Sequence, residues 1–302
     1  MTEIVVGIDD SPGAQDALAL ATRIAATSGA ALRLVSAFPY SDIPSRGAVP
    51  AYRELLRRDA QATLDRSAAA TDATVAATEA IADASPARAL HELGERIGAA
   101  LVVVGSTRRG PLGRVVPGST GERLLHGATC PVAVVPRGYA DRGAIRTVGV
   151  GYDGSHESKA ALSAACHLAR RLGATLRVIR VFDATRVGTP ALMTIPGYVT
   201  ARENLEAQSQ ESLDTAVAAL PADLATESVF VPGNAGPELA AQSELVDLMI
   251  VGSRGYGPRA AVLLGGVTHT LLRKAGCPVI VLPRGSHGFE PLFGPSEAAA
   301  TA

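Results

Sequence analysis

The chain has 302 residues, 47% of them hydrophobic, and a formal net charge of −1 from 28 basic and 29 acidic side chains. The apolar fraction suffices for a sizeable core, and the balanced charge argues against non-specific attraction to a nucleic-acid backbone. Tryptophan is absent and aromatic residues make up 4%, so a stacking surface for single strands is not expected either.

No apolar run approaches the ~20 residues of a membrane span, so no membrane partner is expected. The opening segment, MTEIVVGIDDSP, lacks the basic region of a secretory signal peptide. These two observations predict a cytoplasmic protein.

The first half of the chain alternates short β-branched runs with helical patterns. EIVVGID (3–9) predicts a buried strand, and Ser11 and Pro12 then supply the cap and first-turn proline of a helix that Gly29 ends. Further along we expect strand 32–38, a helix near 50–69, a strand near 73–81, a helix from 85 to about 97, strand 101–104, a helix near 119–127 and strand 131–135. This alternation predicts an α/β fold with a parallel sheet and helices on both faces.

The second half repeats the first. VVGIDDSPGAQDAL (5–18) returns as VGVGYDGSHESKAAL (148–162), and ALVVVGSTRRG (100–110) returns as DLMIVGSRGYG (247–257). Two collinear copies of about 140 residues predict two domains. The predicted bounds are 1–138 and 145–285, with GYADRGA (138–144) as the linker and 286–302 as a fraying tail.

The two copies differ in spacing. From Pro86 to Gly105 the first copy has four more residues than the second has from Pro237 to Gly252, so the third helix of the second copy should be about one turn shorter. DATRVGTPALMTIPGYVT (183–200) carries two prolines and two glycines and is expected to form a longer loop.

Two features of each copy lie where predicted strands end, which is where doubly wound sheets bind ligands. Asp9 and Asp153 close the first strands, and Gly105 and Gly252 begin glycine-rich loops that lead into a helix. A helix start offers unpaired amides to a phosphate, and an aspartate accepts hydrogen bonds from ribose hydroxyls. A structural interpretation stays open, with the glycines as tight turns and the aspartates as helix caps.

The glycine pattern, the repeated CPV strands, the DGS after the first strand of copy two and the pair Gly236-Pro237 resemble the universal stress protein family in its tandem form. The resemblance covers roughly 3–137 and 146–284. It implies two Rossmann-like domains of the adenine nucleotide alpha hydrolase-like type, each a five-stranded parallel sheet with helices on both faces. It also implies ATP as the ligand, with or without magnesium.

In this family the first-strand aspartate and the end of the second strand hold adenosine, and the glycine loop holds the phosphates. The resemblance implies contacts from Asp9, Ala37, Gly105, Gly118 and Ser119 in the first copy, and Arg108 and Thr120 of the same loop are further candidates. In the second copy it implies Asp153, Val181, Gly252, Gly255 and Gly265, with Gly266 as a further candidate.

Each copy departs from the family pattern once. Arg108 stands where the second glycine belongs, at a cost of ~1–2 kcal/mol if that residue is left-handed, although its guanidinium is also suited to a phosphate. Gly266 stands where a serine or threonine belongs, which removes a hydroxyl donor worth ~0.5–1.5 kcal/mol but keeps the amide. These magnitudes favour the second copy slightly as the phosphate site.

Cys130, Cys166 and Cys277 and the six histidines show neither disulfide nor metal-ligand spacing. No general base and nucleophile recur together in both copies, so we expect a nucleotide sensor or signalling protein of the stress response and not an enzyme. Two alternatives stay open. One is a ligand-free interaction scaffold, and the other is an ATP-using enzyme such as an adenylating ligase or ATP pyrophosphatase.

The resemblance finally implies that the two halves pair as an intrachain pseudo-dimer through strands 131–135 and 279–282. Pairing two apolar edge strands is physically reasonable, because an exposed edge invites aggregation. Whether two chains form a homodimer is left open.

Overall fold

The computed structural model describes residues 2–40, 50–106, 114–115, 119–184, 197–253, 265–283 and 292, with the backbone alone at 119 and 198. The first half contains β1 (Glu3–Gly7), α1 (Pro12–Ser28), β2 (Ala31–Phe38), α2 (Pro50–Ala69), β3 (Val75–Ala82), α3 (Pro86–Ile97), β4 (Leu101–Gly105), α4 (Ser119–Leu125) and β5 (Val132–Val135). The second half contains β6 (Thr147–Gly151), α5 (His156–Leu172), β7 (Thr175–Phe182), α6 (Tyr198–Ala218), β8 (Thr226–Pro232), α7 (Ala235–Gln242), the 3₁₀ turn η4 (Ser243–Leu245), β9 (Leu248–Gly252), α8 (Gly266–Lys274) and β10 (Val279–Leu282).

The first helix of each half begins and ends by the same local chemistry. Ser11 and Ser155 have extended backbone, and their hydroxyls accept hydrogen bonds from the amides of Ala14 and Ser158. Gly29 and Gly173 end the two helices in the left-handed region, with φ of 69° and 62°. Glycine carries no Cβ penalty in that region, which is why both helices end at these residues.

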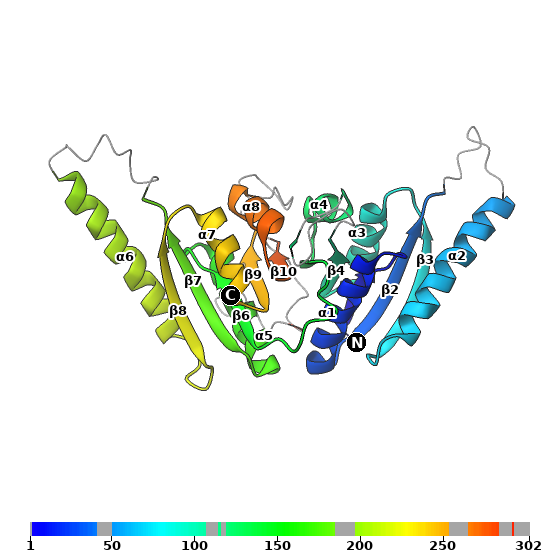
Figure 1. The fold of residues 1–302 in the computed structure, drawn as a ribbon, viewed down its shortest axis with the longest axis horizontal. Coiled ribbons are helices and arrows are strands. Elements are labelled where there is room, and N and C mark those ends of the chain that lie inside the picture. Colours follow the sequence, from blue (N-terminus) through cyan, green and yellow to red (C-terminus); the bar gives the residue numbers. More distant parts are fainter. Residues whose placement is uncertain are drawn as a thin grey trace.

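In the described part of the chain the strands form one ten-stranded sheet with the order β3-β2-β1-β4-β5-β10-β9-β6-β7-β8. Each half is parallel throughout, and the halves join where β5 pairs antiparallel with β10. In that junction Val134, Ala133 and Val132 face Val279, Ile280 and Val281 respectively. The expected α/β class and the pseudo-dimer through the last strands are therefore confirmed (Figure 1).

Helices cover both faces of the sheet. One apolar cluster includes residues of α1, α2, α5 and α6, and the other includes residues of α3, α4, α7 and α8. Figure 1 shows α2 and α6 at the two outer ends of the molecule and β5 and β10 at its middle. α7 has 8 residues and α3 has 12, so the predicted shortening by one turn is also seen.

The linker between the halves is fixed to the first helix. The carboxylate of Asp16, 2% exposed, accepts hydrogen bonds from the amides of Gly138 and Ala140 at 2.9 and 2.8 Å. The guanidinium of Arg23 lies 4.6 Å from the ring centre of Tyr139 and donates to three carbonyls of the linker. Most of the predicted loop 183–200 and, apart from residue 292, the predicted tail lie outside the described residues.

Candidate functional site

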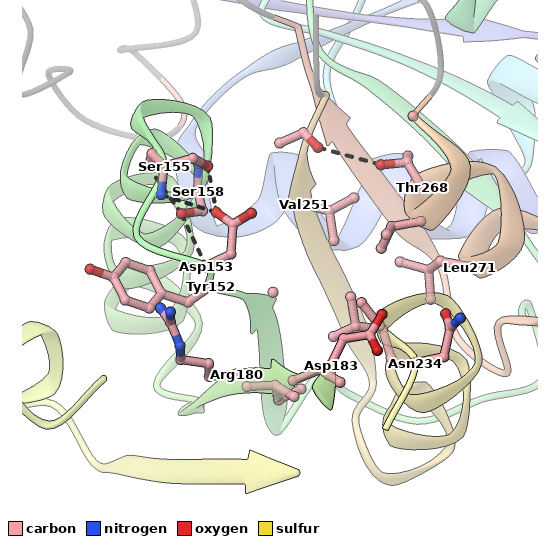
Figure 2. Close-up of a pocket in the computed structure, with 18 of the residues that line it drawn as sticks. Tyr152, Asp153, Ser155, Ser158, Arg180, Asp183, Asn234, Val251, Thr268 and Leu271 are labelled. Carbon is pink, nitrogen blue, oxygen red and sulfur yellow. Dashed lines mark hydrogen bonds between the residues drawn. The ribbon is translucent and has the colours of Figure 1, made fainter. Parts of the chain in front are cut away.

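A cavity of about 850 Å³ lies in the second half, at the carboxyl ends of β6, β7 and β9. Its wall is completed by α6, α7 and the start of α8 (Figure 2). The first half has a smaller cavity of about 330 Å³ at the corresponding ends of β1, β2 and β4. Ligand pockets usually measure about 300–1,000 Å³, so the larger cavity, in the second half, has room for a nucleotide-sized molecule.

The structure brings together the expected residues that it describes. Asp153, Val181, Gly252, Gly265 and Gly266 all line the larger cavity. In the first half the smaller cavity is lined by Asp9, Ala37, Gly105 and Thr120.

Four of the expected site residues cannot be placed relative to the cavities. Arg108, Gly118 and Gly255 lie outside the described residues, and Ser119 is described by its backbone alone. How the central parts of the glycine loops meet a phosphate therefore stays a prediction.

The two aspartates organise the turn that precedes the first helix of each copy. One carboxylate oxygen of Asp153 accepts hydrogen bonds from the amide and the hydroxyl of Ser155, with the amide at 3.0 Å. Asp9 makes the same pair of hydrogen bonds to Ser11, with the amide at 2.9 Å. Serine is the helix cap in both copies, so the aspartates hold the cap and do not replace it, and both carboxylates remain exposed at the cavities.

Gly105 and Gly252 have a structural reason to be glycine. A Cβ at Gly105 would overlap the carbonyl group of Gly13, and one at Gly252 would lie 2.7 Å from the carbonyl oxygen of Glu157. The first helix of each copy thus approaches the end of the fourth strand too closely for any side chain. These two glycines therefore have a structural role, which is the close approach of a helix and not the tight turn that the sequence suggested, and both also line the cavities.

The start of α8 is the feature of the larger cavity best suited to an anion. Gly265 occupies the N-cap position with φ −61° and ψ 151°, and among the described residues no side chain caps the helix. The first amides of α8 are therefore left to solvent or ligand, at the positive end of the helix dipole. Thr268 is buried in the first turn and its hydroxyl donates to the carbonyl oxygen of Gly252 at 3.5 Å, which ties the helix start to the end of β9.

Several polar side chains of this cavity were not expected from the sequence, among them those of Asp183, Asn234 and Arg180. Asp183 follows β7, Asn234 caps α7 and Arg180 extends from β7 (Figure 2). The repeat does single out Arg180. When LRLVSAF (32–38) is aligned with LRVIRVF (176–182), Arg180 falls opposite Ser36, so the two copies differ in charge at this position. Helix α6 also contributes Leu205 and Ser209 to the wall, and nothing in the sequence pattern of this helix indicates that.

Burial raises the pKa of all three cysteine thiols. All three are buried and free, and burial raises the pKa of the Cys130 thiol to about 11. Burial also raises the pKa of Cys277 well above its usual range. The described residues contain no group of three histidine, cysteine, aspartate or glutamate side chains able to hold a metal ion.

The model of the universal stress protein family matches residues 1–136 and 144–283, nearly the whole chain. The chain belongs to the universal stress protein family. A universal stress protein of Mycobacterium tuberculosis, Rv2623, is 29% identical over 300 residues, covering 92% of this chain and 95% of that protein. Another from the same species, Rv2319c, is 30% identical over 199 residues, covering 64% of this chain and 68% of the relative.

Solved structures agree on the fold of this universal stress protein. A universal stress protein of Archaeoglobus fulgidus superposes with a TM-score of 0.62 at 17% identity, covering 94% of this chain and 96% of that one. A functionally unknown protein of Pseudomonas aeruginosa PAO1 gives 0.65 at 18% identity, covering 100% and 98%. In the described part of the chain, none of the helices is long and apolar enough to cross a membrane.

Proposed function

We propose that this protein binds ATP in the cavity of its second half and acts as a nucleotide sensor in the stress response without turning the nucleotide over. One observation carries the proposal. The uncapped start of α8 and the carboxylate of Asp153 line the same cavity of about 850 Å³.

Each part of that cavity matches a part of the nucleotide. The amides of Gly266 and Val267 at the start of α8 suit phosphate oxygens, and Asp153 suits ribose hydroxyls, since a carboxylate accepts charge-assisted hydrogen bonds. Apolar side chains of Val181, Val251 and Leu271 line the remaining wall and suit a purine ring. Magnesium that accompanies the nucleotide would take phosphate oxygens and water as its main ligands, as it commonly does at nucleotide sites.

Calorimetric titration of the full chain with ATP, ADP and AMP tests the proposal. We expect one nucleotide per chain with micromolar or tighter affinity, and negligible release of phosphate or pyrophosphate over hours. Asp153→Asn keeps an oxygen that accepts from Ser155 but loses the charge, and it should weaken binding roughly 10-fold or more.

Asp9→Asn is the matched variant of the first half. A second binding step that disappears in this variant would show that the smaller cavity also takes nucleotide. Titrations without heat, supported by the absence of any thermal shift, would favour the scaffold alternative, and steady nucleotide turnover would favour an enzyme.

A further inference from the structure

Arg180 is a basic side chain held inside the larger cavity. It extends from β7 toward α6, where one terminal nitrogen, Nη2, donates to the hydroxyl of Ser209 at 3.3 Å. The other, Nη1, is shielded from solvent and has no hydrogen-bond partner among the described residues. A buried N–H without an acceptor is costly, so a turn of the guanidinium toward an acceptor that a ligand brings would remove this cost.

Arg180 lines the cavity together with Asp153 and Asp183 but is not held in an ion pair with either of them. No ion pair joins Arg180 to an acidic residue in the part of the chain that the structure describes, whereas Arg177 on the same strand lies 3.7 Å from Glu227. The guanidinium therefore keeps its attraction for an anion, and its planar donors match the oxygens of a phosphate.

Arg180 and the start of α8 lie at different ends of the cavity. β7, which carries Arg180, is separated from β9, which leads toward α8, by β6. Two strand spacings amount to about 10 Å. Figure 2 shows Arg180 beneath Asp153 and on the other side of the cavity from Thr268 and Leu271 of α8. One phosphate group cannot reach both ends.

Arg180 lies instead beside the turn that carries Asp153. Its Nη1 is 3.6 Å from the place a Cβ would occupy on Gly154, the residue after Asp153. If the nucleotide proposed above places its ribose at Asp153, the sugar is the part of the ligand nearest Arg180.

We infer that the second-half cavity prefers an adenine nucleotide that carries a further phosphate on its ribose, at the 2′ or 3′ position. Asp153 accepts from the remaining ribose hydroxyl, Arg180 contacts the added phosphate, and the start of α8 binds the 5′ phosphate. The inference rests on the proposed nucleotide site and assigns its specificity. The first half cannot share this preference, because Ser36, 7% exposed, occupies the position of Arg180.

Calorimetry with AMP, adenosine 2′,5′-bisphosphate and adenosine 3′,5′-bisphosphate tests this on the full chain. One of the two bisphosphates should bind roughly 10-fold or more tightly than AMP, which is the range of one charge-assisted contact. The comparison of the two identifies the ribose position. Arg180→Ser, which copies the first half, should bring the ratio of bisphosphate to AMP affinity close to one, and Arg180→Lys should retain part of the preference.

Arg177→Ser is the control, because Arg177 lies on the same strand but does not line the cavity. It should keep the wild-type ratio. Equal affinities of wild type for AMP and both bisphosphates would overturn the inference while leaving the nucleotide site intact, and so would an equal loss for all three ligands in Arg180→Ser. Failure of AMP, ATP and both bisphosphates to bind would overturn the nucleotide site itself.

Discussion

The glycines of the shared motif do not all serve the same purpose. Gly105 and Gly252 allow the backbone of a helix to approach the end of a strand. Gly266 has open space around the position of its missing Cβ, and it lines the cavity at the start of α8. The motif therefore combines a folding requirement with a requirement of the cavity, and substitutions can separate the two.

Gly105→Ala should reduce the stability of the protein. The new methyl group overlaps the carbonyl group of Gly13, which is backbone and cannot turn aside. Overpacking of this kind costs typically 1–3 kcal/mol of unfolding free energy, measurable by urea denaturation. Gly29→Ala is unsuitable as a control because of its positive φ, so Gly143→Ala, with nothing near its Cβ position, is used. Equal stability of Gly105→Ala and Gly143→Ala would contradict the close approach.

Gly266→Ala should behave in the opposite way. Its methyl group meets no atom of the described residues within 4 Å, and alanine in a helix loses less backbone entropy than glycine on folding. The free energy of unfolding should stay constant or rise by about 0.4–1 kcal/mol. Because Gly266 lines the cavity, the same variant should weaken ATP binding in calorimetry. Unchanged affinity would mean that the ligand does not approach the start of α8.

The positions of the strands and helices show how far the sequence could predict the fold. Strand and helix positions could be predicted because apolar runs, serine caps and terminal glycines occur twice in equivalent places. The shorter α7 followed from a residue count alone. The share of α6 in the cavity wall could not be predicted, because Leu205 and Ser209 come from a helix whose hydrophobic pattern does not indicate a ligand. The role of Arg180 could not be predicted from the repeat alone, because the aligned residue, Ser36, has a different chemistry.

The ion pair between Asp83 and Arg88 at the start of α3 should make the stability of the protein depend on pH. Asp83 accepts hydrogen bonds from the amide of Ser85 at 2.7 Å and from two nitrogens of Arg88 at 2.8 and 2.9 Å. The hydrogen bonds from Arg88 lower the pKa of Asp83 below its usual value. A carboxyl with a lowered pKa in the folded state stabilises the protein above its unfolded pKa, near 3.9, and loses that contribution as the pH falls through the folded value.

Asp83→Asn keeps an oxygen for Ser85 but loses the charge that pairs with Arg88. We expect the variant to be less stable than wild type at pH 7 and the difference to shrink below pH 4. Urea denaturation between pH 7 and pH 3 measures this. A difference that stays constant across the range would mean that the charge of Asp83 contributes nothing.

At the scale of the whole molecule, the two halves share one core. The apolar cluster on the face of α1 and α5 contains residues of both halves, and Tyr139 of the linker lies within it. Together with the pairing of β5 and β10, this continuity predicts that the chain unfolds as one cooperative unit. Two separate transitions in calorimetry would show that the halves are independent.

Two substitutions of Tyr139 test how much the linker contributes to the stability of that core. Its side chain is 1% exposed, its ring lies under Arg23, and its hydroxyl has no hydrogen-bond partner within the described ranges. Because an unpaired buried hydroxyl costs about 1–3 kcal/mol, Tyr139→Phe should leave the free energy of unfolding unchanged or raise it. Tyr139→Ala removes the ring and should cost about 3–5 kcal/mol, as aromatic truncations in cores do. Similar destabilisation in both variants would show that the hydroxyl, and not the packed ring, holds the two halves together.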